Sequence, residues 1–197
     1  MRSYRKYGET ARLPANAGKI TSKMVVRPRP GKPTQGILQW AGQAFPGALG
    51  RGGIRAVKRE SDGATPLGPM RLLHGYFRVG PTRALSAAAP SSPLPFRAIR
   101  AEDGWCDAPG DRNYNRKVTL PYPASSETMR RADRLYDCVI VLDYNIRPRR
   151  RGMGSAIFFH IAREGFAPTE GCVAVSPRVM ARLLPHLSRR TVLVVSR

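Results

Sequence analysis

Short apolar runs, separated by glycine and proline, recur along most of the chain. The runs are rich in β-branched and aromatic residues and are bounded by turn-forming residues, a pattern that is typical of β-strands. We predict strands over these segments: residues 23–27, 36–40, 53–58, 70–79, 97–101, 135–144, 155–161 and 191–196. The pattern indicates a mainly β fold, either a sandwich or an open barrel, with a few short helices.

Two segments carry helix signals instead. Residues 125–134 begin with serine caps and place Glu127 in the first turn. Ser176 and Pro177 supply an N-cap and a first-turn proline to a second helix that runs to His186. The apolar residues of this second helix recur at helical spacing: Val179, Met180, Leu183, Leu184 and Leu187. We expect them to pack against the sheet as core residues, not to form a cofactor-binding motif.

The pattern predicts one domain preceded by a basic tail. A length of 197 residues and a hydrophobic content of 42% are enough for one folded core. Residues 1–22 show little hydrophobic periodicity, so we expect a weakly structured tail there and a folded domain over residues 23–197. Residues 81–95 are rich in Ala, Ser and Pro, and we interpret them as an exposed loop that forms a lid or a rim.

The charge balance is strongly basic. The chain has 34 Lys and Arg against 13 Asp and Glu, a formal net charge of +21, which favours anionic partners such as nucleic acid, a membrane surface or an acidic polymer. Basic composition alone gives only non-specific phosphate attraction, and no nucleic-acid-binding motif accompanies it, so we expect no nucleic-acid partner. No apolar run is long enough for a transmembrane helix, and the start of the chain lacks the apolar run of a secretory signal.

A cysteine and a histidine near the C-terminus form a candidate catalytic pair. His160 ends an apolar run, and Cys172 follows it after a short loop. An imidazole within hydrogen-bond reach can accept the proton of a thiol and so activate the thiol as a nucleophile. The spacing therefore indicates acyl transfer through a thioester on Cys172.

The remaining cysteines and histidines have structural interpretations. Cys138 lies in an apolar run and Cys106 in a turn-rich segment, and three cysteines cannot all pair within the chain. The spacings of zinc sites are absent, so we predict no metal site. His74 lies in a strand-like run and His186 near a helix end, where both are expected to be structural or solvent-facing.

Several ordered segments resemble one protein family. The segment around the cysteine reads Thr169-Glu170-Gly171-Cys172, and further agreement covers residues 58–68, 103–107, 114–116, 135–137 and 154–160. Together they resemble the YkuD-type L,D-transpeptidase catalytic domain, in the variant whose nucleophile motif is Thr-x-Gly-Cys. The resemblance spans roughly residues 24–196.

The resemblance implies an enzyme of the bacterial cell envelope or periplasm that needs no cofactor. It would cleave a peptidoglycan stem peptide after its third residue, hold it as a thioester and pass it to an amine of another stem peptide or of an envelope protein. Water as the acceptor would make it an L,D-carboxypeptidase. Cys172 would be the nucleophile and His160 the base, with backbone N–H groups of Gly171 and Cys172 as the oxyanion hole. Carbapenem β-lactams would be covalent inhibitors.

Substrate contacts are predicted at three further residues. Tyr144 carries a hydroxyl at a strand end, Thr169 lies in the nucleophile motif, and Arg151 closes a basic run over residues 147–151. That run is either a solvated loop or a rim that meets the carboxylates of the stem peptide. Residues 61–68 have turn chemistry, and we interpret them as structural.

The motif departs from the commonest family pattern. Glu170 replaces a histidine often found before the Gly-Cys pair, Ala174 replaces an arginine or asparagine, and the interval from His160 to Cys172 is shorter than usual. These changes concern substrate specificity more than reaction type. Two other classes stay open: a catalytically idle module that binds peptidoglycan or another polyanion, and a nucleic-acid-binding protein.

Overall fold

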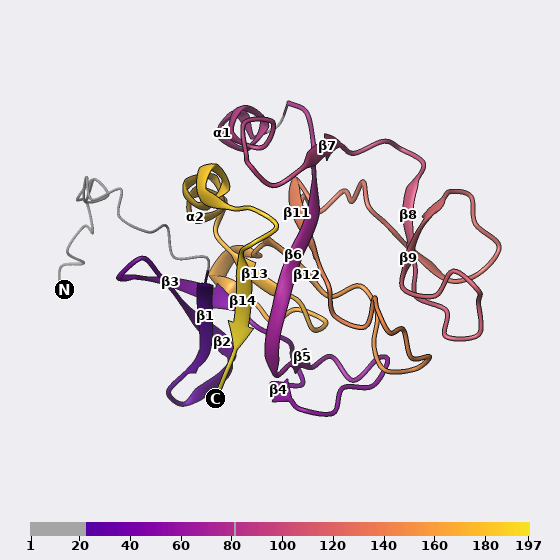
Figure 1. Ribbon diagram of the computed structural model, residues 1–197, viewed down its shortest axis with the longest axis horizontal. Coiled ribbons are helices and arrows are strands. Elements are labelled where there is room, and N and C mark those ends of the chain that lie inside the picture. The colour runs from indigo at the N-terminus through magenta and orange to yellow at the C-terminus, as the bar shows by residue number, and fades with distance from the viewer. Residues whose placement is uncertain (1–22, 81) are drawn as a thin grey trace, which may run out of the picture.

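The computed structural model describes residues 23–80 and 82–197 (Figure 1). The predicted tail over residues 1–22 lies outside the described residues. Among the described helices, none is long and apolar enough to cross a membrane. The predicted mainly β architecture is confirmed.

The central feature is a nine-stranded sheet that closes on itself. Its order is β11-β12-β13-β3-β2-β1-β14-β6-β7, and an additional antiparallel pairing of β11 with β6 closes the barrel, with β7 outside the ring. The strands are β1 (Lys23–Arg29), β2 (Lys32–Trp40), β3 (Gln43–Ala48), β6 (Gly68–Phe77), β7 (Phe96–Ala98), β11 (Cys138–Leu142), β12 (Phe158–Ile161), β13 (Val173–Val175) and β14 (Val192–Val195).

Two smaller sheets lie beside the barrel. A three-stranded sheet joins β8 (Asp103–Cys106) to β9 (Arg116–Thr119) on one side and to β10 (Ser126–Thr128) on the other. A short parallel pair joins β4 (Ile54–Arg55) and β5 (Thr65–Pro66). In Figure 1 the β8–β9 unit projects from the barrel wall that contains β11 and β12.

The strand β11 is apolar at every position because it is covered on both faces. Cys138, Ile140 and Leu142 enter the main core, which the helices close. Val139 and Val141 enter a second cluster on the opposite face of the sheet. Side chains alternate across a strand, so a continuous apolar run divides evenly between two cores.

The predicted C-terminal helix is confirmed. It forms as α2 (Pro177–Leu183) and continues as a 3-10 turn, η2 (Leu184–His186). The Ser176 hydroxyl accepts a hydrogen bond from Val179 N at 3.3 Å, so it caps the helix as predicted. The apolar positions predicted as core are buried or packed against the core: Val179, Met180, Leu183, Leu184 and Leu187.

The lid or rim predicted over residues 81–95 is wrong. Much of that segment forms α1 (Arg83–Ala88), which packs against α2. Leu85 and Leu94 are buried in the main core. The alanine-rich composition is explained by a short helix on a packed surface, where small side chains allow close approach.

The helix predicted over residues 125–134 is also wrong. Residues 126–128 form β10, in which Glu127 pairs with Trp105 of β8, and turns follow. The serine and glutamate signals were local, whereas burial of Met129 and cross-strand pairing determine the strand. Cys106, predicted in a turn-rich segment, lies in β8 and is fully buried.

The strand predictions agree with the structure where a run packs in the barrel, but residues 53–58 contain only the two-residue β4. Some strands were missed altogether: β3, β5, β8, β9, β10 and β13. Pro46 and Gly47 obscure β3, and β13 immediately follows the nucleophile motif, where turn residues dominate the pattern.

Candidate active site

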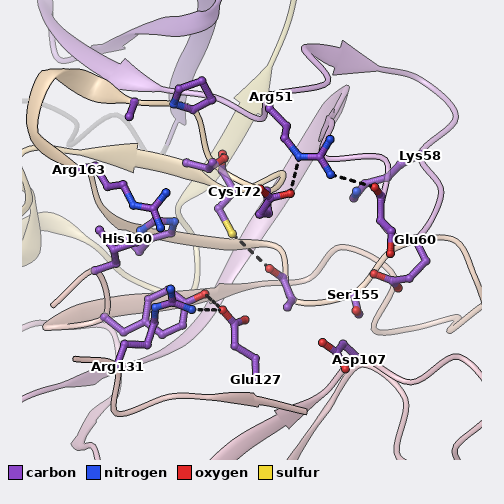
Figure 2. Close-up of a pocket in the computed structure, with 18 residues that line it drawn as sticks. Arg51, Lys58, Glu60, Asp107, Glu127, Arg131, Ser155, His160, Arg163 and Cys172 are labelled. Carbon is purple, nitrogen blue, oxygen red and sulfur yellow. Dashed lines mark hydrogen bonds and ion pairs between the residues drawn. The ribbon is translucent and has the colours of Figure 1, made fainter. Parts of the chain in front are cut away.

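Parallel pairing of β12 with β13 brings His160 and Cys172 to one cavity. His160 lies in β12, and Cys172 directly precedes β13, whose Ala174 pairs with His160. The connecting loop contains a short 3-10 turn, η1 (Glu164–Phe166). Both side chains line a cavity of about 440 Å³ (Figure 2).

The Cys172 thiol is buried and hydrogen-bonded. Its Sγ donates to the Ala156 carbonyl at 3.2 Å and accepts from Phe158 N at 3.4 Å. Burial raises the pKa of Cys172 to about 12, and the nearby Glu127 acts in the same direction, while the Phe158 N–H and the Lys58 charge lower this pKa. The thiol is therefore protonated near neutral pH.

The His160 imidazole is buried and neutral. Its Nδ1 lies 2.8 Å from the Ile161 carbonyl, so in the tautomer that donates this bond Nε2 is an acceptor. Burial lowers the pKa of His160 to about 4, which the bond to Ile161 only partly opposes. Both members of the predicted pair are therefore neutral near pH 7.

Glu127, Arg131 and Tyr136 form a hydrogen-bonded group that packs beside His160. Arg131 Nη1 and the Tyr136 hydroxyl each donate to Glu127 Oε1 at 2.8 Å. The Tyr136 ring meets His160 edge-on, with centroids 5.3 Å apart, and the Arg131 guanidinium carbon lies 5.2 Å from the centroid of the Tyr136 ring. Burial raises the pKa of Glu127. Sequence reasoning missed this group, because Glu127 was interpreted as a first-turn residue of a helix over residues 125–134.

The nucleophile loop is held by Thr169. Its Oγ1 donates to the Cys172 carbonyl at 2.7 Å and accepts from Gly171 N at 3.2 Å. The Gly171 N–H, predicted for the oxyanion hole, therefore points to Thr169 here. Gly171 has a φ of 131°, and a Cβ at this position would meet the Ala64 carbonyl at 2.8 Å, so both conformation and space require glycine.

The predicted turn over residues 61–68 packs against this loop. Asp62 accepts hydrogen bonds from Lys58 Nζ at 2.6 Å and from Arg59 N and Ala64 N at 2.8 Å. Burial would raise the pKa of Asp62, but these bonds lower it. Thr65 Oγ1 accepts from Gly50 N and donates to the Cys172 carbonyl at 3.5 Å. The turn thus positions the backbone around Cys172.

Two predicted substrate contacts lie outside the cavity lining. The Tyr144 hydroxyl donates to the Met153 carbonyl at 2.9 Å, and Arg151 is exposed in its loop. Thr169 does line the cavity. Sequence reasoning missed the rim pair Arg51–Glu170, whose Nε and Oε2 are 2.7 Å apart, although Glu170 was identified as a departure from the family pattern.

The other cysteines and histidines lie away from the cavity. Cys106 and Cys138 are buried free thiols. His74 Nε2 is 3.1 Å from the Tyr76 hydroxyl, and His186 packs on Trp40. Within residues 23–80 and 82–197, no group of three His, Cys, Asp or Glu side chains is arranged to hold a metal ion.

The family model of the YkuD L,D-transpeptidase catalytic domain matches residues 32–195. The chain therefore belongs to this family. No curated protein matches the sequence significantly.

Solved structures with a similar fold include an L,D-transpeptidase from Mycobacterium smegmatis, with 13% identity, 89% of this chain and 58% of that chain covered, and a TM-score of 0.40. Bd1075 of Bdellovibrio bacteriovorus has 14% identity, coverages of 88% and 47%, and a TM-score of 0.41. L,D-transpeptidase 3 from Mycobacterium tuberculosis, in complex with a faropenem-derived adduct, has 11% identity, coverages of 88% and 60%, and a TM-score of 0.36. The chain thus spans only about half to three fifths of the length of these proteins.

Proposed function

We propose that this protein is a cysteine-dependent L,D-transpeptidase that acts on peptidoglycan stem peptides through a thioester on Cys172. The observation that carries the proposal is that His160 of β12 and Cys172, which directly precedes the adjacent parallel strand β13, line the same cavity. Membership of the YkuD family supports the same reaction class. The cell envelope would be the site of action.

In the first half-reaction, Sγ of Cys172 attacks the carbonyl carbon of the third residue of the stem peptide. His160 Nε2 accepts the thiol proton, and the C–S bond forms. The tetrahedral intermediate then collapses, the C–N bond breaks, and the leaving amine takes the proton from His160. In the second half-reaction an acceptor amine attacks the thioester carbonyl and loses a proton to His160 as the new C–N bond forms. The C–S bond then breaks, and His160 returns the proton to Sγ of Cys172.

Charge on the reacting oxygen would be stabilised by backbone and side-chain donors. The Cys172 N–H is the candidate that remains from the predicted oxyanion hole, whereas the Gly171 N–H is engaged by Thr169. Lys58 adds positive charge close by: its Nζ lies 3.4 Å from the Cβ position of Gly171. Asp62 pairs with this charge at 2.6 Å, so part of the charge is already compensated.

The test is the intact mass of the protein after incubation with a carbapenem, which acylates such a thiol. We expect one adduct on the wild type and on Cys106→Ala, a control that removes a different buried thiol, and none on Cys172→Ala. A folded wild type without an adduct would contradict the proposal.

A second candidate is a catalytically idle module that binds peptidoglycan or another polyanion, favoured by the net charge of +21. It predicts salt-sensitive binding to purified cell wall, equal in wild type and Cys172→Ala, without any carbapenem adduct. The two candidates are therefore separated by the same pair of proteins.

A further inference from the structure

One side of the cavity is acidic, although the chain as a whole is strongly basic. Glu60, Asp107 and Glu127 line it together with Ser155, and we call these four residues the acidic wall. In Figure 2 Glu60, Ser155 and Asp107 lie near one another, and Glu127 lies beside Arg131, with which it forms an ion pair. Only 13 residues of the chain are acidic against 34 basic ones, so three carboxylates on one wall require a physical explanation.

Four separate segments build the acidic wall. Asp107 directly follows β8, Glu127 lies in β10, Glu60 lies in the loop before β5, and Ser155 comes shortly before β12. Because these segments are distant in sequence, the fold itself brings the carboxylates together beside Cys172.

Two atoms of the acidic wall are buried without a hydrogen-bond partner among the described residues, Ser155 Oγ and Asp107 Oδ1. Ser155 is only 7% exposed. Burial and Glu60 raise the pKa of Tyr114, and the nearby Ser155 hydroxyl lowers it. The Ser155 hydroxyl nevertheless makes no hydrogen bond of ordinary geometry. A buried polar group is costly unless it is paired, so these atoms indicate a ligand.

The carboxylates also lack enough basic partners. Within the described chain, no Lys, Arg or His nitrogen forms an ion pair with Glu60 or Asp107, and the Tyr114 hydroxyl donates to Glu60. Glu127 receives both of its hydrogen bonds on Oε1, which leaves Oε2 open. The nearby Lys58 is already paired with Asp62. Among the described residues, Glu60 and Asp107 therefore present negative charge that no ion pair neutralises, whereas Glu127 is paired with Arg131.

We propose that the acidic wall binds an ammonium group of the substrate. An ammonium ion has three N–H donors and one positive charge, which match the open oxygens of Asp107, Ser155 and Glu127. This inference rests on the proposed function, because it assumes that peptide substrates enter this cavity. The ammonium belongs either to a side chain of the acyl donor or to the acceptor, which binds as an ammonium ion and releases one proton to water before its amine attacks the thioester.

The first experiment measures binding without reaction, by titration calorimetry on Cys172→Ala. The probes are a stem-like tetrapeptide with lysine as its third residue and the same peptide with norleucine there. If the donor supplies the ammonium, the lysine peptide binds about ten- to a hundredfold tighter, as expected for a charge-assisted hydrogen bond. Adding Asp107→Asn removes this preference, and the matched control Glu102→Gln, an exposed carboxylate outside the cavity lining, retains it.

The second experiment tests the acceptor. With the norleucine donor and wild-type enzyme, the KM for a lysine-amide acceptor is compared with its value in Asp107→Asn and in Glu102→Gln. If the acceptor supplies the ammonium, Asp107→Asn raises this KM about tenfold or more, and Glu102→Gln leaves it unchanged. Ser155→Ala gives a smaller change in the same direction, and it replaces Asp107→Asn if that variant fails to fold.

No lysine preference in the binding experiment, together with an unchanged acceptor KM, would overturn the inference. Because binding is measured on Cys172→Ala, this result is independent of the carbapenem test. A carbapenem adduct without any preference for an ammonium group overturns only the inference that the acidic wall binds ammonium. A preference for the lysine peptide without a carbapenem adduct overturns only the proposed reaction.

Discussion

Replacement of Asp62 by alanine should destabilise the protein strongly, because it leaves a buried lysine charge without its partner. Lys58 and Asp62 have only 3% and 11% of their side chains exposed, and their charged atoms are 2.6 Å apart. Removing one member of such a pair typically costs about 3–5 kcal/mol. Asp62 also accepts two backbone hydrogen bonds, from Arg59 and Ala64, which favours the upper half of that range.

We therefore expect Asp62→Ala to lower the free energy of unfolding by about 4 kcal/mol. For a chain of this size, that corresponds to a melting temperature lower by roughly 10 °C. Urea denaturation, with the m-value compared between variants, measures the first quantity, and a thermal melt measures the second. The double variant Lys58→Met/Asp62→Ala should recover part of the loss, because it removes the unpaired charge.

Two results would refute this reasoning. One is a loss below about 1 kcal/mol in Asp62→Ala, which is the range of an exposed ion pair. The other is a double variant that is no more stable than Asp62→Ala, because the cost would then not come from the charge of Lys58.

The pH dependence of the same pair follows from the sign of the shift. The pKa of Asp62 is lowered in the folded protein, against about 3.9 in an unfolded chain. A lowered folded pKa stabilises the protein above the unfolded pKa, and this contribution is lost as the pH falls through the folded pKa. The difference in the free energy of unfolding between wild type and Asp62→Ala should have its full value at neutral pH and shrink below about pH 4.

Three further predictions concern the nucleophile and its loop. Thr169→Val should slow carbapenem acylation about tenfold or more by removing both side-chain bonds to the loop, while Thr169→Ser retains most of the rate. The pKa of Cys172 is about 12 and that of His160 about 4, so iodoacetamide should alkylate Cys172 only slowly at pH 7. The alkylation rate should then rise about tenfold per pH unit up to pH 10, without a plateau. Gly171→Ala should reduce acylation, measured by mass, and lower the melting temperature.

Each of these has a contrary outcome. Equal acylation rates in Thr169→Val and wild type would show that the loop does not depend on its hydroxyl. An alkylation plateau near pH 7 would show that the free enzyme already holds a thiolate. A Gly171→Ala protein with wild-type melting and acylation would show that the loop accommodates a side chain next to Ala64.

Hydrophobic periodicity was sufficient to predict an element where the local sequence pattern and the tertiary packing favour the same secondary structure. The helix after Ser176 was predicted correctly, because its cap, its proline and its apolar spacing all lie within one segment. The apolar runs at β11 and β12 likewise indicated buried strands. At residues 125–134 the local signals favoured a helix, but pairing with β8 decided the outcome, since burial of Met129 outweighs a weak propensity.

The family resemblance, the mainly β class and the candidate pair Cys172 and His160 were predictable from the sequence, because they depend on residue types at short spacings. What surrounds the pair was not predictable, because it depends on how the chain packs. The support of His160 by Glu127 and Tyr136, the engagement of the Gly171 N–H by Thr169, and the acidic wall all join segments far apart in the chain. Such contacts are set by how the strands pack, and no local pattern encodes them.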